Sequence, residues 1–232
     1  MKMKTHTITF LAAACVAMPQ SYAAVLAEYA FTGGSASATN ADANVTANDF
    51  TVGAGISGLA GFSGTSNSAF ARTTGTTGST LSFATAFAND DFFSVIIGAN
   101  SGYYMDLDSF TFDYGYTSTV DQSGDLRYYV TTSVDNHAAF LNFDTVTSVS
   151  INNPTPTYPL SNNTDLSAFN YVWDGSDIEF RIYLSDQYNL GDVIHRIDNV
   201  ILNGTISVVP EPSSVALLGL GGLALMLRRK RS

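Results

Sequence analysis

Apolar and polar residues alternate over several short stretches of the chain, which is typical of half-buried β-strands. In residues 178–184 every second residue is isoleucine, phenylalanine or leucine, and polar residues such as Glu179 lie between them. We therefore place Glu179 on a wet strand face, as a solvated charge. Residues 126–131 alternate in the same way, and residues 81–85 do so more weakly. Residues 92–97 are almost continuously apolar, which predicts a strand in the interior of a sheet.

The alternation changes phase between Tyr104 and Tyr114. Met105 and Leu107 share one side of the expected strand, and the aromatic residues at 110, 112 and 114 fall on the other. One extra, unpaired residue in the strand would bring both groups of apolar side chains to the same face of the sheet. The pattern therefore predicts a β-bulge near Asp108-Ser109.

Turn residues separate these stretches. Asp174-Gly175 and Asn203-Gly204 are dipeptides that favour tight hairpin turns, and residues 98–102 form another break. Residues 152–163 contain three prolines and predict a loop or an irregular edge. Residues 33–78 are rich in small and polar residues, which predicts short edge strands and long loops.

We find no convincing helical period outside the two ends of the chain. About ten short strands in one domain, residues 24–209, predict an all-β fold: a two-sheet β-sandwich of the jelly-roll type. The stretch from His195 to Gly204, which reads HRIDNVILNG, resembles the last strand of galactose-binding-like and carbohydrate-binding jelly rolls.

The N-terminus has the features of a signal peptide over residues 1–23. Two early lysines precede an apolar run at residues 8–17, and Ser21-Tyr22-Ala23 provides small residues at −3 and −1 of a cleavage site. Cys15 raises the alternative of a lipoprotein signal, although the usual leucine three residues earlier is absent. Otherwise Cys15 leaves with the signal, and the remaining domain has neither disulfides nor thiol chemistry.

The last 23 residues have three parts. Pro210-Glu211-Pro212 is extended because proline fixes φ and removes backbone donors. Residues 213–227 form an apolar run rich in Gly, Ala and Leu, which as a helix would span roughly 22 Å, short for a membrane core of about 30 Å. The chain then carries four basic residues that would stop it on the cytoplasmic side: Arg228, Arg229, Lys230 and Arg231. An ordinary single-pass anchor is the alternative.

These three parts, in this order, resemble a PEP-CTERM sorting domain. The resemblance implies a substrate of exosortase, a membrane-embedded, cysteine transpeptidase-like enzyme of Gram-negative bacteria. It also implies transient membrane insertion of the C-terminal segment, cleavage at or near Pro210-Glu211-Pro212, and a protein of the cell surface or extracellular matrix. Together with the signal peptide it makes the secretion machinery a further partner.

The domain between the two signals is strongly acidic. Residues 24–209 contain four arginines, no lysine and 19 acidic residues, a formal charge of −15. Nucleic-acid binding requires a basic surface, so this charge excludes it, and it disfavours anionic polymers for the same reason. Divalent cations and neutral glycans are the compatible ligands.

Catalytic motifs are missing from the sequence. There is no Gly-x-Ser-x-Gly elbow for a serine hydrolase and no His-x-x-x-His pair for zinc. His195 is flanked by Asp192 and Asp198, but a spacing of three on a strand places side chains on opposite faces. We therefore do not expect an enzyme, and a polysaccharide-active enzyme is only the third alternative.

Two groups of residues are candidate binding sites. Tyr171 and Trp173 share one face of a predicted strand and could stack on sugar rings, although a core position for Trp173 explains the pattern as well. The acidic pairs Asp106/Asp108 and Asp174/Asp177 could hold a structural Ca²⁺, although solvated aspartates are the alternative.

The sequence as a whole predicts an exported, exosortase-processed surface or matrix protein with a structural or adhesive role and no cofactor beyond a possible Ca²⁺. The second interpretation is a carbohydrate-binding module that acts on extracellular polysaccharide.

Overall fold

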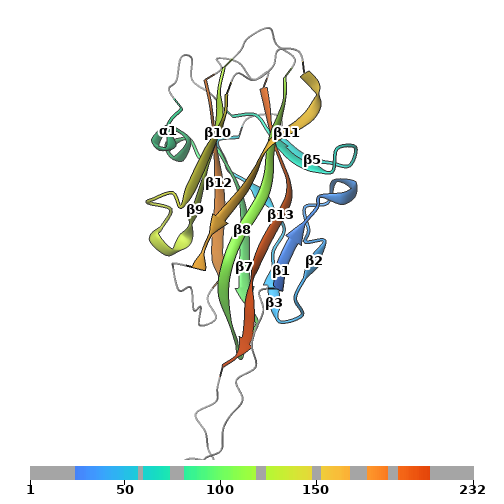
Figure 1. Cartoon of the computed structure of the whole chain (residues 1–232), viewed down its shortest axis with the longest axis vertical. Coiled ribbons are helices and arrows are strands. Elements are labelled where there is room, and N and C mark those ends of the chain that lie inside the picture. Colours follow the sequence, from blue (N-terminus) through green and yellow to red (C-terminus); the bar gives the residue numbers. More distant parts are fainter. Residues whose placement is uncertain are drawn as a thin grey trace, which may run out of the picture.

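The computed structural model describes residues 24–56, 60–73, 81–118, 124–147, 153–167, 177–187 and 193–209. Two antiparallel sheets pack face to face into an elongated sandwich (Figure 1). We refer to them by their central strands as the β8 sheet and the β12 sheet.

The β8 sheet has the strand order β11-β8-β13-β1-β2, with β6 paired to β13 and β5 paired to β6. Its strands are β1 (Ala24–Tyr29), β2 (Asn40–Ala41), β5 (Ala60–Ser63), β6 (Ser68–Ala71), β8 (Tyr103–Ser118), β11 (Asn153–Asp165) and β13 (Val193–Val208).

The β12 sheet has the order β10-β9-β12-β7-β3, with β4 also paired to β7. Its strands are β3 (Val45–Ala47), β4 (Thr51–Val52), β7 (Phe92–Ala99), β9 (Leu126–Thr132), β10 (Asn142–Val146) and β12 (Ile178–Asp186). Three short helices complete the described part: η1 (Thr32–Gly34), α1 (Phe83–Ala88) and η2 (Ser133–Asp135).

The longer strands follow the jelly-roll order. They form the four-stranded sets β1-β13-β8-β11 and β7-β12-β9-β10, and the chain passes repeatedly from one set to the other. A jelly roll consists of two such sheets built from two Greek keys. The predicted β-sandwich of jelly-roll type is therefore confirmed.

Aromatic side chains from both sheets fill the interior. Phe110 of β8 stacks on Phe180 of β12 with ring centroids 4.8 Å apart. Tyr128 of β9 meets Phe112 at 4.9 Å and Tyr114 at 5.0 Å. All five rings are at most 2 % exposed. Burying each such side chain contributes about 1.5–3 kcal/mol, so this aromatic core is a main source of stability.

The predicted bulge lies where the phase change placed it. Asn203 of β13 pairs with Ser109, and the next residue, Gly204, pairs with Leu107, so Asp108 is the extra residue. Residues on both sides of the bulge consequently point into the core, including Met105 and Phe110.

The hairpin turn predicted at Asn203-Gly204 is wrong, because both residues lie within β13. A Cβ at Gly204 would lie 2.3 Å from the carbonyl oxygen of Asp106. The glycine is therefore needed for close approach of the bulged β8 backbone, and not for a turn.

The weak strand predicted over residues 81–85 is also wrong, because residues 83–88 form α1. Phe83, Ala86 and Phe87 follow the i, i+3, i+4 spacing of a helix face, which sequence reasoning overlooked. Ala86 is buried, and the rings of Phe83 and Phe87 contact each other at 5.7 Å.

The irregular features were predicted correctly. The proline-rich segment forms the edge strand β11, whose register shifts on both sides of Thr157. Between residues 40 and 71 the strands have only two to four residues each. Residues 92–97 lie in β7, which pairs on both sides. The predicted turn at Asp174-Gly175 lies outside the described residues.

Candidate functional site

An aromatic cluster covers the outer face of the β12 sheet, on the side away from the core. Strand alternation turns Phe92 of β7, Tyr129 of β9 and Tyr183 of β12 outward, and α1 packs over them. We call the whole cluster the aromatic face, and its members are Phe83, Phe87, Phe92, Tyr129, Phe140, Phe143 and Tyr183. Figure 1 shows α1 beside β9 and β10, in the half of the sandwich away from the end of β13.

Phe83 holds the cluster together. Its ring centroid lies 5.4 Å from Tyr129, 5.5 Å from Phe140 and 5.5 Å from Tyr183, the last at an interplanar angle of 89°. Such edge-to-face pairs contribute about 0.5–1.5 kcal/mol beyond the area they bury. The face is therefore a small second core outside the main one.

The rim of this second core is open to solvent. Phe87 is 41 % exposed, Phe140 41 % and Phe143 47 %, whereas Tyr183 beneath them is fully buried. An open pocket of about 300 Å³ lies among Phe83, Ala84, Phe87, His137 and Ala138. Small-molecule sites have this composition: apolar walls with few polar groups.

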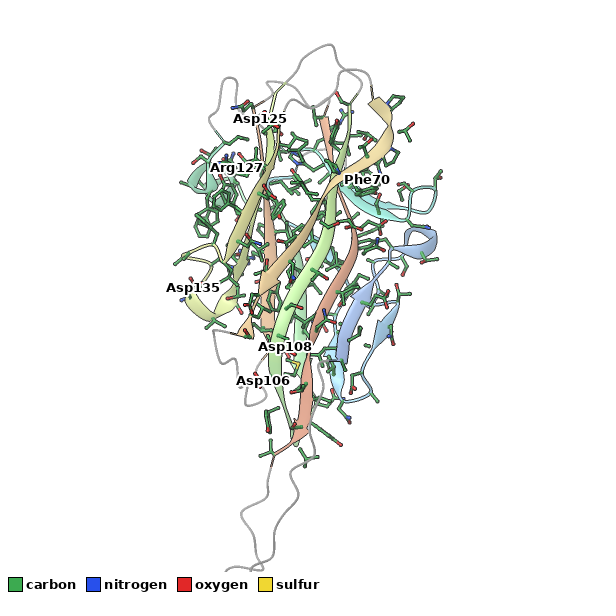
Figure 2. All side chains as sticks on the ribbon, in the orientation of Figure 1. Phe70, Asp106, Asp108, Asp125, Arg127 and Asp135 are labelled. Atoms are coloured by element: carbon green, nitrogen blue, oxygen red, sulfur yellow. The ribbon has the colours of Figure 1, made fainter. Side chains whose placement is uncertain are left out.

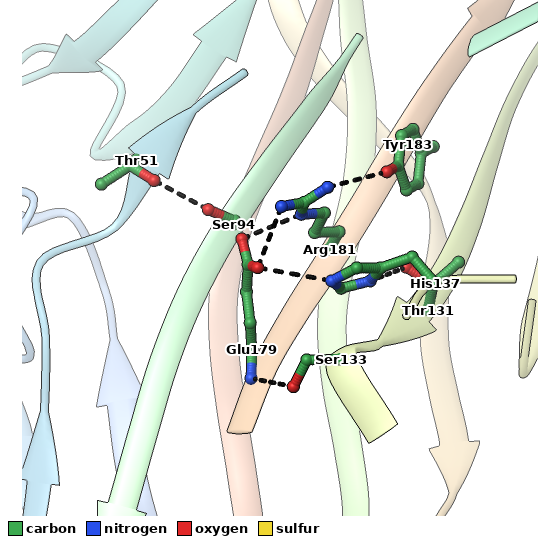
Figure 3. A network of polar contacts seen from close by, with 8 residues as sticks. All are labelled: Thr51, Ser94, Thr131, Ser133, His137, Glu179, Arg181 and Tyr183. Atoms are coloured by element: carbon green, nitrogen blue, oxygen red, sulfur yellow. Dashed lines mark hydrogen bonds and ion pairs between the residues drawn. The ribbon is translucent and has the colours of Figure 1, made fainter. Parts of the chain in front are cut away.

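Beside the pocket, Glu179 is the centre of a polar network (Figure 3). Arg181 donates two hydrogen bonds to its carboxylate, from Nε to Oε1 at 2.9 Å and from Nη2 to Oε2 at 3.0 Å. Arg181 also donates to the hydroxyl of Tyr183 at 3.2 Å and lies over the ring of Phe92 at 4.2 Å. Glu179 is thus a paired charge on a covered surface, and its prediction as a solvated residue is wrong.

His137 connects this network to the pocket. Its Nε2 lies 3.3 Å from Oε2 of Glu179 and its Nδ1 lies 2.7 Å from Oγ1 of Thr131. Asn136 and His137 both have left-handed backbones, with φ values of 57° and 59°. Such conformations cost of the order of 1 kcal/mol each in a residue other than glycine and are common at functional sites.

Burial and neighbouring charges set the protonation of the network. Burial lowers the pKa of His137, and the Arg181 charge lowers it further, which outweighs the carboxylate of Glu179. Burial alone would raise the pKa of Glu179, but the hydrogen bonds and charge of Arg181 bring it below its usual value. At neutral pH the histidine is therefore neutral, with Nε2–H donating to Glu179 and Nδ1 accepting from Thr131.

A second polar chain lies inside the sandwich. His195 is fully buried, with Nδ1 2.7 Å from the Tyr114 hydroxyl and Nε2 3.1 Å from Oδ2 of Asp186. Thr73 donates to the same Asp186 oxygen. His195 thus has an aspartate of β12 as its partner. Asp192, one of the two aspartates that flank it in the sequence, lies outside the described residues. Because His195 is completely buried, this series of hydrogen-bonded side chains is a structural element of the core.

The predicted calcium ligands are only partly described. Figure 2 places Asp106 and Asp108 on the lower part of β8, with Asp106 exposed and Asp108 at the bulge. Asp177 is exposed and packs over Gly98, where a Cβ would lie 2.1 Å from its Oδ1. Asp174, Tyr171 and Trp173 lie outside the described residues. In the described part of the chain, no three His, Cys, Asp or Glu side chains gather as metal ligands would.

Comparison with protein families bears on the export and processing of the chain. Residues 208–231 match the family model of the PEP-CTERM protein-sorting motif. The chain carries a PEP-CTERM sorting signal. It is therefore a PEP-CTERM sorting domain-containing protein, which supports its export and its processing by exosortase.

Two further comparisons concern the rest of this PEP-CTERM protein. No curated protein matches it. Among solved structures, it is similar to the family 11 carbohydrate-binding module from Clostridium thermocellum in complex with a β-1,3-1,4-mixed-linked tetrasaccharide, with a TM-score of 0.31 and 13 % identity over 77 % of this chain and 96 % of that one. A likeness of this size says nothing about the ligand of the PEP-CTERM protein.

The sorting motif begins inside the folded domain. Val208 is the last residue of β13, and Val209 donates a backbone hydrogen bond to Gly102 at 2.8 Å. Pro210-Glu211-Pro212 and the four terminal basic residues lie outside the described residues. Among the residues that are described, no helix is long and apolar enough to cross a membrane.

Proposed function

We propose that this PEP-CTERM protein is an adhesive protein of the cell surface or extracellular matrix that binds a neutral extracellular polysaccharide through the aromatic face. The observation that carries the proposal is the open pocket at Phe87, together with the exposed phenylalanines Phe140 and Phe143 of the same aromatic face.

Exposed rings suit the apolar C–H faces of sugars. Phe87 lies on α1, Phe143 on β10 and Phe140 just before β10, and each contacts another ring of the aromatic face. Side chains fixed by ring packing lose little entropy on binding. His137 also lines the pocket, and because both of its ring nitrogens are engaged by Glu179 and Thr131, the pocket offers a sugar mainly apolar surface.

The charge of the domain favours a neutral glycan. At −15, residues 24–209 repel uronate- or sulfate-bearing polymers at long range. The residues that line the pocket carry no carboxylate and no permanent cation. A neutral ligand therefore meets no electrostatic cost.

The pocket supports binding more than hydrolysis. Glycoside cleavage requires a pair of carboxylates on either side of the scissile bond. Of the acidic residues beside the pocket, Glu179 is occupied by Arg181 and His137, and Oδ2 of Asp135 accepts a hydrogen bond from the Ala139 backbone. We therefore propose that the pocket binds glycans and does not cleave them. Release of reducing sugar from a bound polysaccharide would instead indicate hydrolysis.

Affinity electrophoresis of residues 24–209 tests the proposal. Native gels that contain dextran, xyloglucan or galactomannan should retard the domain in at least one case, whereas alginate should not. Equal mobility in every neutral gel would overturn glycan binding.

Two residues of similar exposure provide the matched control. Phe87, on the aromatic face, is 41 % exposed, and Val134, on η2, is 43 % exposed. We expect Phe87→Ala to weaken binding about tenfold, which corresponds to about 1.4 kcal/mol, and Val134→Ala to change it less than twofold. Equal effects would place the ligand elsewhere.

Sorting is tested separately in the producing organism. Replacement of Pro210-Glu211-Pro212 by alanines should leave the C-terminal segment uncut and change the cellular location of the protein. An unchanged mass together with an unchanged surface pool would instead favour an ordinary membrane anchor.

A further inference from the structure

The end of the sandwich that carries the C-terminus has an uncharged, partly apolar tip. It consists of the turn at Ser101-Gly102, the first residues of β8 (Tyr103 and Tyr104), and Val208 and Val209. Val208 is 65 % exposed and Val209 42 %, and both tyrosines are half-buried. We call this group the tip.

The tip is a rigid part of the fold. Val208 pairs with Tyr103 and Ser207 with Tyr104, so β8 and β13 remain in register to their ends. The Val209 backbone N–H donates to the Gly102 carbonyl oxygen at 2.8 Å. The folded domain therefore extends to the residue that immediately precedes Pro210.

The chain leaves almost no spacer between the tip and the membrane-directed segment. The apolar run of the sorting signal begins at Ser213, four residues after Val209. At full extension of about 3.3–3.6 Å per residue, four residues reach at most about 14 Å. While the precursor is uncut, the tip must stay within this distance of the point at which the chain enters the bilayer.

We propose that the tip is a membrane-contacting surface of the uncut precursor, with Tyr103, Tyr104, Val208 and Val209 at the lipid headgroup level. Tyrosine is enriched at membrane–water interfaces because its ring is apolar and its hydroxyl remains hydrated. The occupant of this surface is the bilayer that holds the sorting segment of the same chain, because the short connection brings it there.

Charge limits the depth of this contact. Asp106 is exposed two residues further along β8, on the same side as Tyr104, and Figure 2 shows it in the lower part of the sandwich above the tip. A carboxylate is disfavoured in the apolar layer. The contact is therefore confined to the headgroup region.

The contact also orients the domain. The first residue of β1, Ala24, pairs with Gly204, four residues before the end of β13, so both ends of the domain lie in the same half of the sandwich. α1, which packs on the aromatic face, lies in the other half (Figure 1). A tip held on the membrane thus directs the aromatic face away from the membrane.

Single-cysteine probes test this proposal on the full chain. Cys15 is replaced by serine, and an environment-sensitive fluorophore is attached at Ser101→Cys in the tip or at Gln187→Cys. Gln187 is exposed and accepts a hydrogen bond from Asp125, which Figure 2 shows at the opposite end. The chain is reconstituted in phosphatidylethanolamine–phosphatidylglycerol vesicles that contain a lipid with a nitroxide on its headgroup.

We expect the nitroxide to quench the Ser101→Cys probe at least fivefold more than the Gln187→Cys probe. Tyr103→Ser with Tyr104→Ser, or a twelve-residue Gly/Ser insertion after Val209, should lower the Ser101→Cys quenching at least twofold. Equal quenching at the two positions would overturn the proposal. Strong quenching at Ser101→Cys that neither change affects would also contradict it, because neither the rings nor the short connection would then matter. Glycan binding is measured without a membrane, so its outcome is independent of this one.

Discussion

The two outer faces of the sandwich are both formed by alternating strands, but they hold an arginine in opposite ways. Arg181 of the β12 sheet forms a two-bond ion pair with Glu179 beneath the aromatic face. Among the described side chains, Arg196 of the β8 sheet donates only to hydroxyls: to Ser66 and Ser68 at 2.9 Å each and to Thr117 at 3.3 Å. Within the described residues, Arg196 forms no ion pair.

Both arginines are partly buried, but the side chains around them differ. On the β12 sheet, α1 and the segment before β10 add a second layer of side chains, and a charge under such a layer needs a counter-charge. On the β8 sheet, the bonding partners of Arg196 are small hydroxyls, and burial lowers the pKa of Arg196 without a compensating carboxylate. We call the outer face of the β12 sheet, on which α1 packs, the covered face, and the outer face of the β8 sheet the open face.

The largest effect is expected from removing the central carboxylate of the covered face. Glu179→Gln removes the counter-charge of Arg181 and weakens the acceptor of the neutral His137, and we expect a loss of about 2 kcal/mol in the free energy of unfolding. Glu28→Gln, a partly exposed glutamate on β1, should stay within about 0.5 kcal/mol of the parent. Urea denaturation of residues 24–209 measures both. Equal losses would remove the distinction between the faces.

A matched pair of arginine replacements compares the faces directly. Arg181→Met leaves a partly buried carboxylate next to His137 and should cost about 1–2 kcal/mol. Arg196→Met leaves only hydroxyls, which can bond elsewhere, and should cost less than about 1 kcal/mol. The difference in midpoint urea concentration between the two variants is the measurement. A larger loss for Arg196→Met would show that the open face is the more strongly coupled one.

The pH dependence of stability should carry the signature of His137. Its pKa is lower in the folded protein than the ordinary 6.5, so the unfolded chain binds more protons as pH falls below that value. Stability is therefore complete above pH 6.5 and decreases as pH falls through the folded pKa. Urea midpoints between pH 7.5 and 5 should decrease less in His137→Gln than in the parent. Parallel pH curves would contradict the neutral, buried histidine.

The smallest expected effect concerns calcium on the open face. If Asp106 and Asp108 bind Ca²⁺ with further oxygen ligands, millimolar CaCl₂ raises the melting temperature more than NaCl of equal ionic strength. Replacement of both residues by asparagine should abolish that difference, because it removes the negative ligands. Equal shifts in the two salts would exclude a specific site at this pair.

The sequence contained enough to predict the sandwich and little of the pocket. The phase change at Met105 and Phe110 located the bulge because strand alternation is a local property. The environment of Glu179 is not local, because His137 reaches it from a loop 42 residues earlier in the chain. The i, i+4 spacing of Phe83 and Phe87 was readable as a helix, but nothing in their neighbourhood shows that the helix covers a sheet. Asp186 and His195 likewise meet across two sheets, so their pairing depends on the fold.

The central claim is that the two outer faces differ in function, and one pair of substitutions tests it most directly. Phe140 belongs to the aromatic face, and Phe70 lies under Arg196 on the β8 sheet at 5.6 Å (Figure 2 labels it). Each is replaced by serine in residues 24–209, folding is checked by circular dichroism, and retardation is measured in the neutral polysaccharide gel that binds the parent most strongly. We predict that Phe140→Ser weakens retardation at least fivefold and that Phe70→Ser changes it less than twofold. Equal losses, or a greater loss for Phe70→Ser, would contradict the assignment of the aromatic face as the binding surface.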